Sequence, residues 1–266
     1  MLVLLKKYLW ILLISYKNHT IYVYDVIWNI LIFWLRIAII SLLLKTIYLA
    51  GDTQTIGWFT VVQLSIAMMF SQVISVSKPD ITKLIDFDIK SWKISSYMLN
   101  PISYVWFKFF ENFAGFLFNV VVFMVLGILI ILLIFGELTT SMFWVFGWIV
   151  MILLSMLISF FGYMLMGLFA FFVEDSQPFR WIYSKIDMLL GWDILPLTFL
   201  PWIWQTIAFS LPFAYWGYTA GLVFSNFSVN TFLFFFFVQL IWIIVFVILC
   251  LRIYSVWKKK MNINWG

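Results

Sequence analysis

Charge, cysteine and histidine are scarce in this sequence. Only 10% of the 266 residues are Asp, Glu, Lys or Arg, and there is one cysteine, Cys250, and one histidine, His19. A single cysteine excludes an intrachain disulfide, and these two residues are too few for a Cys/His zinc cluster. The phosphate-binding pattern G-x-x-x-x-G-K-[ST] is also missing from the sequence. We therefore expect no metal and no bound cofactor in this chain.

Apolar side chains dominate instead, at 65% of the residues, with 31 Phe and 16 Trp. A water-exposed surface could not carry them, whereas about 20 apolar residues of helix are what a bilayer requires. The sequence predicts an all-α integral membrane protein of one domain, residues 1–266, with six transmembrane helices. The predicted spans are Tyr22–Leu49, Gly57–Val76, Tyr104–Phe135, Phe143–Val173, a run within Phe179–Leu211, and Phe232–Arg252.

Basic residues divide the connecting segments into two classes. Lys and Arg precede the first span, lie between the second and third, follow the fourth and follow the sixth, whereas residues 50–56, 136–142 and 191–230 contain none. Because basic segments stay in the cytoplasm, we predict that both termini are cytoplasmic. The net charge of +5 then reflects basic flanks that face the cytoplasm. Membrane lipids are expected partners, and no nucleic-acid partner is expected. Residues 1–20 are short and interrupted by lysine, which predicts an N-terminal interfacial helix.

Proline interrupts the fifth predicted span. Each proline removes a backbone donor and kinks a helix, and non-helical backbone at membrane depth needs protein or a cavity around it. We predict a broken fifth span and outer re-entrant helices in an extracytoplasmic region, residues 191–230. An ordinary Trp-rich outer loop is the alternative. The residues assigned to an outer gate are Pro196, Pro201, Trp202 and Pro212.

Residues 78–103, predicted to form a cytoplasmic loop, hold a cluster of mixed charge. The segment ITKLIDFDIKSWKI has the rough amphipathic pattern of a short helix. Such a helix could rest on lipid head groups. It could instead dock a soluble partner by inserting Phe87 or Trp92 into a groove, with Asp86, Asp88 and Lys90 at the rim. Composition does not choose between the two.

The same segment resembles the cytoplasmic loop of the permease subunits of type-2 ABC transporters. In that family an acidic residue and an isoleucine precede a basic or glycine position, and a Leu-x-Pro-Ile turn opens the third span. The matching residues are Asp88-Ile89-Lys90 and Leu99-Asn100-Pro101-Ile102, and Leu211-Pro212-Phe213 is similar to the family's outer Leu-Pro-Phe segment. The likeness covers nearly the whole chain in order and spacing. Ser91-Trp92 departs from it, because family members often carry glycine there.

The resemblance implies that this loop forms a coupling helix that docks on a separate ATPase. Two ABC ATPase subunits would bind ATP and Mg, so this chain would not be an enzyme by itself. A second copy or a related permease would complete an exporter for an amphipathic or hydrophobic substrate in a bacterial plasma membrane. The expected ATPase contacts are Asp86, Phe87, Asp88, Ile89, Lys90 and Trp92.

Polar residues also lie inside two predicted spans. Asp25, Asn29 and Arg36 share one helix face. Asn29 and Arg36 lie four and eleven residues after Asp25, which places them about 40° and 20° from it on a helical wheel. Asn112 and Asn119 repeat part of this spacing in the third span. A charge near mid-bilayer needs a partner or a cavity. We predict that these five residues line a substrate route. The alternative for Arg36 is that it pairs with a carboxylate or with carbonyls and holds helices together.

Two other function classes compete with a permease. A membrane-embedded serine-histidine enzyme would need His19 at depth, yet His19 lies in the interfacial segment. An ion-coupled secondary transporter or a channel would show repeated halves with ionisable residues in matching broken spans. No convincing internal repeat is present, and this class is the alternative that we retain.

Overall fold

The computed structural model describes residues 7, 10–14, 23–51, 55, 59–98, 103–136, 145–173, 176–191, 193, 196–225 and 228–264. All elements in these ranges are helices, as predicted. The long helices are α2 (Val23–Ala50), α3 (Val61–Ser77), α6 (Tyr104–Phe135), α7 (Val145–Leu168) and α11 (Val229–Asn264). The short ones are α4 (Ile81–Lys90), α5 (Ile94–Met98), α8 (Gln177–Leu190), α9 (Trp202–Ser210), α10 (Phe213–Ser225) and the 3-10 turns η2 (Phe169–Phe171) and η3 (Leu197–Phe199).

Five helical segments are long and apolar enough to cross a membrane. They are Trp28–Ala50, Val61–Lys90, Tyr104–Phe135, Phe146–Phe171 and Val229–Lys259. A sixth candidate is the pair α9 and α10, which is bent by 81°. The described part of the chain therefore has the helices of an integral membrane protein, with six candidate spans when the bent pair counts as one.

The fifth span differs in position from the prediction. The sequence places it within residues 179–211, but the bent pair covers residues 202–224. Residues 177–190 form a separate helix, α8, which has Pro178 in its first turn and Gly191 at its C-cap. Proline suits a first helical turn, where its missing N–H would be unbonded, so Pro178 starts a helix here.

Two other helix boundaries bear on the predictions. Of the predicted interfacial helix, residues 10–14 are helical, and most of segment 1–20 lies outside the described residues. Helix α3 begins with a capping box, in which the Thr60 side chain accepts from the Gln63 N–H and the Gln63 side chain accepts from the Thr60 N–H. It ends just before Pro79, because the residue before proline is disfavoured in helical backbone.

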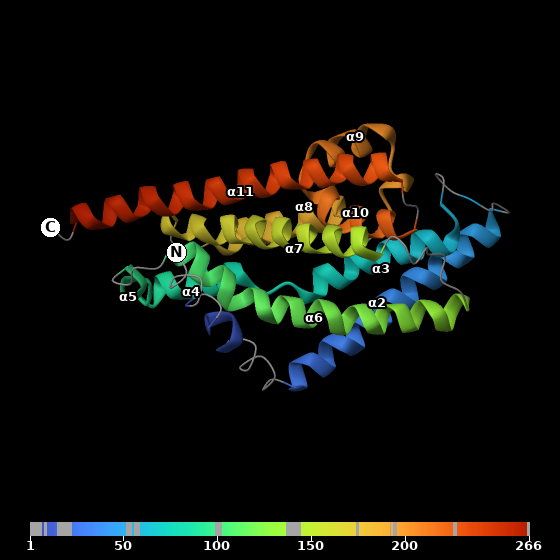
Figure 1. Ribbon diagram of the computed structural model, residues 1–266, viewed down its shortest axis with the longest axis horizontal. Coiled ribbons are helices and arrows are strands. Elements are labelled where there is room, and N and C mark those ends of the chain that lie inside the picture. The colour runs from blue at the N-terminus through green and yellow to red at the C-terminus, as the bar shows by residue number, and fades with distance from the viewer. Residues whose placement is uncertain are drawn as a thin grey trace.

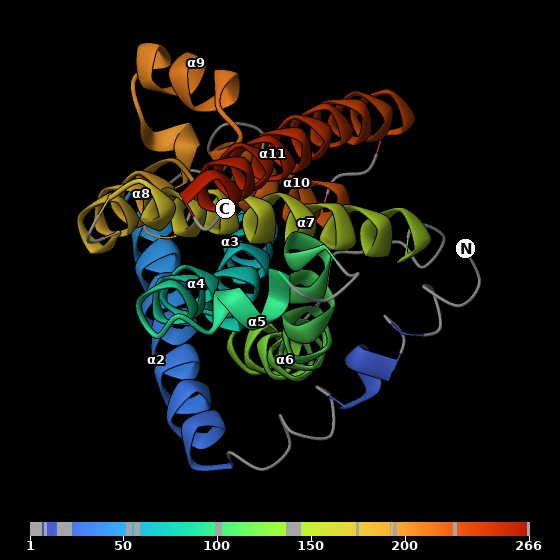
Figure 2. The ribbon, with the colours of Figure 1, turned by 90° about the vertical axis from the view of Figure 1, so that its left-hand side faces the viewer.

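Helix α3 occupies the centre of the bundle. It packs against α2, α6 and α10, while α7 packs against α4, α10 and α11. Figure 1 shows α6, α7 and α11 running along the long axis of the molecule, with α2 crossing obliquely. Seen from the end that holds α4 and α5, α9 projects away from the other helices (Figure 2). The other helices therefore bury most of α3, whereas α2 and α11 turn most of their residues outward.

Helix α10 reaches deep into this bundle. Gly217 lies against Ser71, and a Cβ at Gly221 would overlap the backbone of Ala67. Small residues allow helix backbones to approach this closely, which strengthens the van der Waals attraction between helices in a membrane. The predicted extracytoplasmic region, residues 191–230, thus contributes a helix to the protein core.

Aromatic contacts bring four segments together at one end of the molecule. Tyr104 at the start of α6 stacks on Tyr254 of α11 and donates a hydrogen bond to Asp88 of α4. Phe171 of η2 stacks on Trp257 of α11, with the ring centroids 4.0 Å apart. The basic segments around α4 and the C-terminal part of α11 therefore lie at the same end, as Figure 1 also shows.

Candidate functional site

Helix α4 is the amphipathic helix that the charged cluster predicts. The Asp80 side chain caps its start by accepting from the Lys83 N–H, at 3.4 Å. The helix ends at Lys90, where Ser91 forms the C-cap. Its buried residues are Ile81, Thr82, Ile85 and Asp88. One face of α4 therefore belongs to the protein interior, and Asp88 belongs to that face.

Asp88 and Lys108 form a buried ion pair that ties α4 to α6. The carboxylate and ammonium are 2.8 Å apart, and each side chain is only 4% exposed. Tyr104 donates a second hydrogen bond to Asp88, at 3.1 Å, and Lys108 also contacts Glu111 at 2.8 Å. Charges this far from water persist only when they are paired and hydrogen-bonded. Asp88, predicted as a contact to a partner protein, instead pairs with Lys108 and accepts from Tyr104 within this chain.

The same face of α4 is held against α7. The Thr82 hydroxyl donates to the Tyr163 carbonyl at 2.9 Å. Ile85 packs on Gly167, where an added Cβ would lie 2.9 Å from the Ile85 Cδ1 atom. Glycine therefore lets α4 lie directly on the backbone of α7.

Polar contacts join α4 to the start of α8. Ser176 donates to Asp86 at 3.0 Å, and Arg180 pairs with Asp80 at 2.8 Å. Asp86 also pairs with Lys90, four residues along the same helix, at 2.7 Å. The two ion pairs are partly exposed, so each stabilises the fold only modestly.

The opposite face of α4 and the turn that follows the helix carry exposed apolar side chains. Leu84 is 40%, Phe87 63% and Trp92 64% exposed. Trp92 adopts a left-handed backbone conformation with φ of 58°, which disfavours a side chain as large as tryptophan. Leu84 and Phe87 of α4, together with Trp92 in the turn after it, are named the exposed face of α4 below. Ile89 beside them is half-buried.

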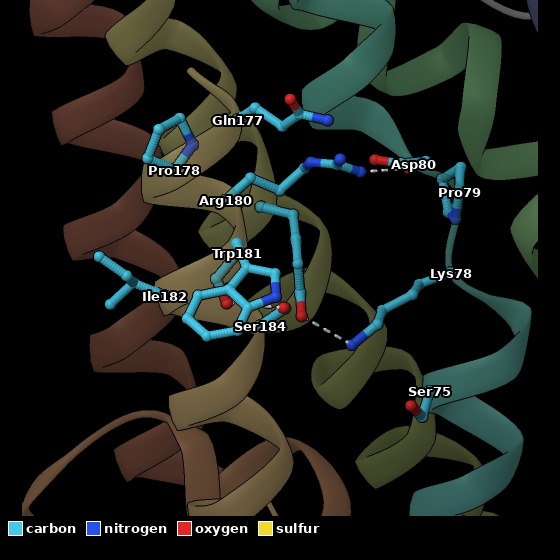
Figure 3. Close-up of a pocket in the computed structure, with 11 residues that line it drawn as sticks. Ser75, Lys78, Pro79, Asp80, Gln177, Pro178, Arg180, Trp181, Ile182 and Ser184 are labelled. Carbon is cyan, nitrogen blue, oxygen red and sulfur yellow. Dashed lines mark hydrogen bonds and ion pairs between the residues drawn. The ribbon is translucent and has the colours of Figure 1, made fainter. Parts of the chain in front are cut away.

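A pocket of about 690 Å³ opens between the end of α3 and α8. Figure 3 shows Arg180 directed at Asp80 on one side, and Lys78 and Ser75 on the α3 side. The Lys78 ammonium pairs with Asp187 at 2.8 Å, and the Asp187 carboxylate also accepts from Tyr163 and Trp216, both at 2.6 Å. This cluster ties together α3, α7, α8 and α10 at the break between α3 and α4.

Sequence reasoning missed the partners in this cluster. Arg180 and Asp187 lie seven residues apart in α8, a spacing that returns to the same helix face. An arginine and an aspartate on one face of this helix are the signal for an ionic contact with another helix. The partners themselves, Asp80 and Lys78, depend on tertiary structure.

The polar faces predicted for α2 and α6 are not joined in one site. Asn29 and Arg36 of α2 are exposed, and for Asp25 the structure describes the backbone in α2 but not the side chain. Asn112 donates to the Lys108 carbonyl at 2.9 Å, and Asn119 is half-buried. Arg36 instead lines a pocket with Gln72 and Asp193, and the asparagines of α6 do not line it.

The residues predicted as an outer gate lie around α9. Pro196 and Pro201 form the N-caps of η3 and α9. Trp202 is 74% exposed, while Pro212 is buried at the bend between α9 and α10. Proline therefore starts η3 and α9 and lies at the break between α9 and α10.

Comparison with known proteins adds nothing to this geometry, since no protein-family model and no curated protein matches the chain.

Proposed function

We propose that this chain is the membrane-spanning permease subunit of an ATP-driven exporter of the type-2 ABC class. The observation that supports this proposal most is that α4 has one face anchored in the protein and one face exposed. One face is anchored to α6, α7 and α8, and the other presents Leu84 and Phe87, with Trp92 in the turn just after the helix. A partner protein that docks on exposed aromatic side chains gains most of its affinity from a few such residues.

The strained backbone at Trp92 supports docking over simple contact with lipid head groups. A left-handed conformation costs a residue with a side chain about 1–2 kcal/mol. A tryptophan retained there and left 64% exposed is explained by a contact made outside this chain. In the proposed assembly a separate ATPase subunit makes that contact.

The proposed assembly has two ATPase subunits, which bind ATP and Mg, and two permease chains, either identical or related. The end of the bundle that holds α4 faces the cytoplasm of a bacterium, in keeping with the basic residues of α4 and α11. ATP-driven closure of the ATPase subunits moves α4, and its anchors carry the movement into α6, α7 and α8. The cargo is an amphipathic or hydrophobic molecule.

Purification of the tagged chain from its native membrane tests the proposal. We expect an ATPase with P-loop motifs to co-purify, and Phe87→Ala with Trp92→Ala to reduce its recovery at least about tenfold. Trp202→Ala is the matched control, because Trp202 is even more exposed, at 74%, but lies on α9. A solitary oligomer that transports its cargo with an ion gradient would refute the proposal and favour a secondary transporter.

A further inference from the structure

Arg36, an arginine of a membrane-spanning helix, shares a pocket with a carboxylate and an unpaired amide oxygen. The pocket holds about 290 Å³ and is lined by Arg36, Ile39, Ile40, Gln72, Met188 and Asp193. These residues come from α2, α3, the end of α8 and the segment that follows it. None of them belongs to α4 or to the pocket of Figure 3.

Gln72 presents an acceptor without a donor. Its side chain is 2% exposed, and its Nε2 donates to the Asp193 backbone carbonyl, which fixes the direction of the amide. Its Oε1 has no hydrogen-bond partner among the described residues. A buried polar atom without a partner costs free energy, so a ligand that donates to Gln72 Oε1 is favoured.

Asp193 adds a second acceptor of negative charge. Ser71 donates to one carboxylate oxygen at 3.1 Å and Ser75 to the other at 2.7 Å. A carboxylate has about four lone-pair positions, so these two bonds leave acceptor capacity on both oxygens. Asp193 and Gln72 together form an acceptor-rich side of the pocket, suited to an ammonium group.

Arg36 supplies the opposite character. A guanidinium carries five N–H donors in a planar fork and binds phosphate or carboxylate groups. The pocket therefore has one donor pole and one acceptor pole, a pattern complementary to a zwitterion. Its volume is at the lower limit of drug-sized sites, roughly 300–1,000 Å³, so it fits a head group and not a whole lipid.

The apolar rim indicates where the rest of such a ligand would lie. Ile39 lines the pocket and is 61% exposed, and Leu35, Leu42 and Leu43 are exposed on the same helix. The pocket thus opens onto an apolar surface of α2. Acyl chains can lie along that surface while the head group enters the pocket.

We propose that this pocket binds a head group that carries a primary ammonium and a phosphate, as in phosphatidylethanolamine. Arg36 holds the phosphate, and Asp193 with Gln72 Oε1 holds the ammonium. The inference goes beyond the proposed function and does not require an ATPase partner, because it uses only residues of this chain. The same chemistry could reach the site as a lipid or as a free zwitterion.

Native mass spectrometry of the full chain in detergent tests this site with three lipids of identical acyl chains. Phosphatidylethanolamine should bind at least about tenfold more tightly than phosphatidylcholine, whose quaternary ammonium cannot donate, and phosphatidylglycerol, which has no ammonium. This comparison uses the unmodified protein, so misfolding of a variant cannot obscure it. Equal binding of the three lipids would overturn the proposal.

Variants assign the two poles. Asp193→Asn should remove the preference for the ethanolamine lipid and leave the phosphatidylglycerol affinity unchanged. Arg36→Gln should weaken all three lipids about tenfold, whereas Lys45→Gln, the control on the same helix, should change none. An equal effect of the Arg36 and Lys45 substitutions would also overturn the proposal. Competition by free phosphoethanolamine would identify the head group as sufficient, and its failure to compete would show that the acyl chains are needed.

Discussion

The buried pair of Asp88 and Lys108 allows a quantitative prediction about what holds α4 in place. Lys108 contacts two carboxylates, Asp88 and Glu111, each at 2.8 Å. Among the described residues, Asp88 pairs with Lys108 as its cation and accepts one further bond, from Tyr104. Asp88 therefore depends on Lys108 more than Lys108 depends on Asp88. Single substitutions should reveal this as different losses of folding free energy.

Lys108→Met removes the cation and leaves a buried carboxylate with a single phenol donor. Loss of one partner from a buried ion pair costs about 3–5 kcal/mol. Asp88→Asn should cost less, about 1–3 kcal/mol, because Lys108 keeps Glu111 and the asparagine can still accept from Tyr104. The double variant should cost less than the sum of the two, by about 0.5–3 kcal/mol, because the residues are in contact.

Cys250 provides the assay. It is the one cysteine of the chain and is completely buried, so a thiol-reactive fluorophore should label it only when the protein unfolds. A cost of 3–5 kcal/mol corresponds to a fall in Tm of about 6–20 °C for a chain of this size. The control is Lys83→Met, which breaks the exposed pair of Lys83 and Asp80 and should shift Tm little. Equal losses from Asp88→Asn and Lys108→Met, or strictly additive losses, would refute the reasoning.

Three further substitutions test other parts of the structure. Trp92→Gly should raise the free energy of unfolding by about 1 kcal/mol, because glycine tolerates the φ of 58°. The same substitution should reduce recovery of the ATPase in the pull-down. Unchanged recovery would show that Trp92 is not part of the interface. Gly221→Ala should lower Tm by forcing α10 away from Ala67, at a cost of about 1–3 kcal/mol. A Gly221→Ala variant with the Tm of the unmodified chain would contradict the packing argument. Asp88→Asn should leave ATPase co-purification intact while lowering cargo transported per ATP hydrolysed, since it loosens α4 from α6 without altering Phe87 or Trp92.

The apolar spans could be predicted from the sequence because their signal is local. Runs such as Tyr104–Phe135 need no knowledge of the rest of the chain, and the structure gives the third span the same bounds. Proline in residues 191–230 likewise predicts broken helices from local chemistry. The predicted fifth span treats Phe179–Leu211 as one apolar run. In the structure Gly191, Pro196 and Pro201 divide this run by their helix-end and helix-start preferences, and the bent candidate pair covers residues 202–224.

The candidate site was predictable only as a segment. The sequence identifies residues 78–103 as unusual, but it assigns Asp86 and Asp88 the same role, although Asp88 is buried against Lys108 and Asp86 contacts Ser176. Which carboxylate turns inward depends on helices brought together from distant parts of the chain. The same limit applies to Arg36, whose neighbour Asp193 is 157 positions away in sequence and shares its pocket only in the folded chain.

The anchors of α4 determine how a push on its exposed face would be transmitted. Contacts to α6, α7 and α8 hold its inner face, so α4 resists bending and moves as a unit. Residues 78–80 lie between α3 and α4, where the helix is interrupted at Pro79, so the path from α4 to α3 passes through this break. Lys78 lies in that break and pairs with Asp187 of α8, which also accepts from Trp216 of α10. In the proposed exporter, displacement of α4 therefore acts first on this ion pair, and through it on α10, the helix most closely packed against the centre of the bundle.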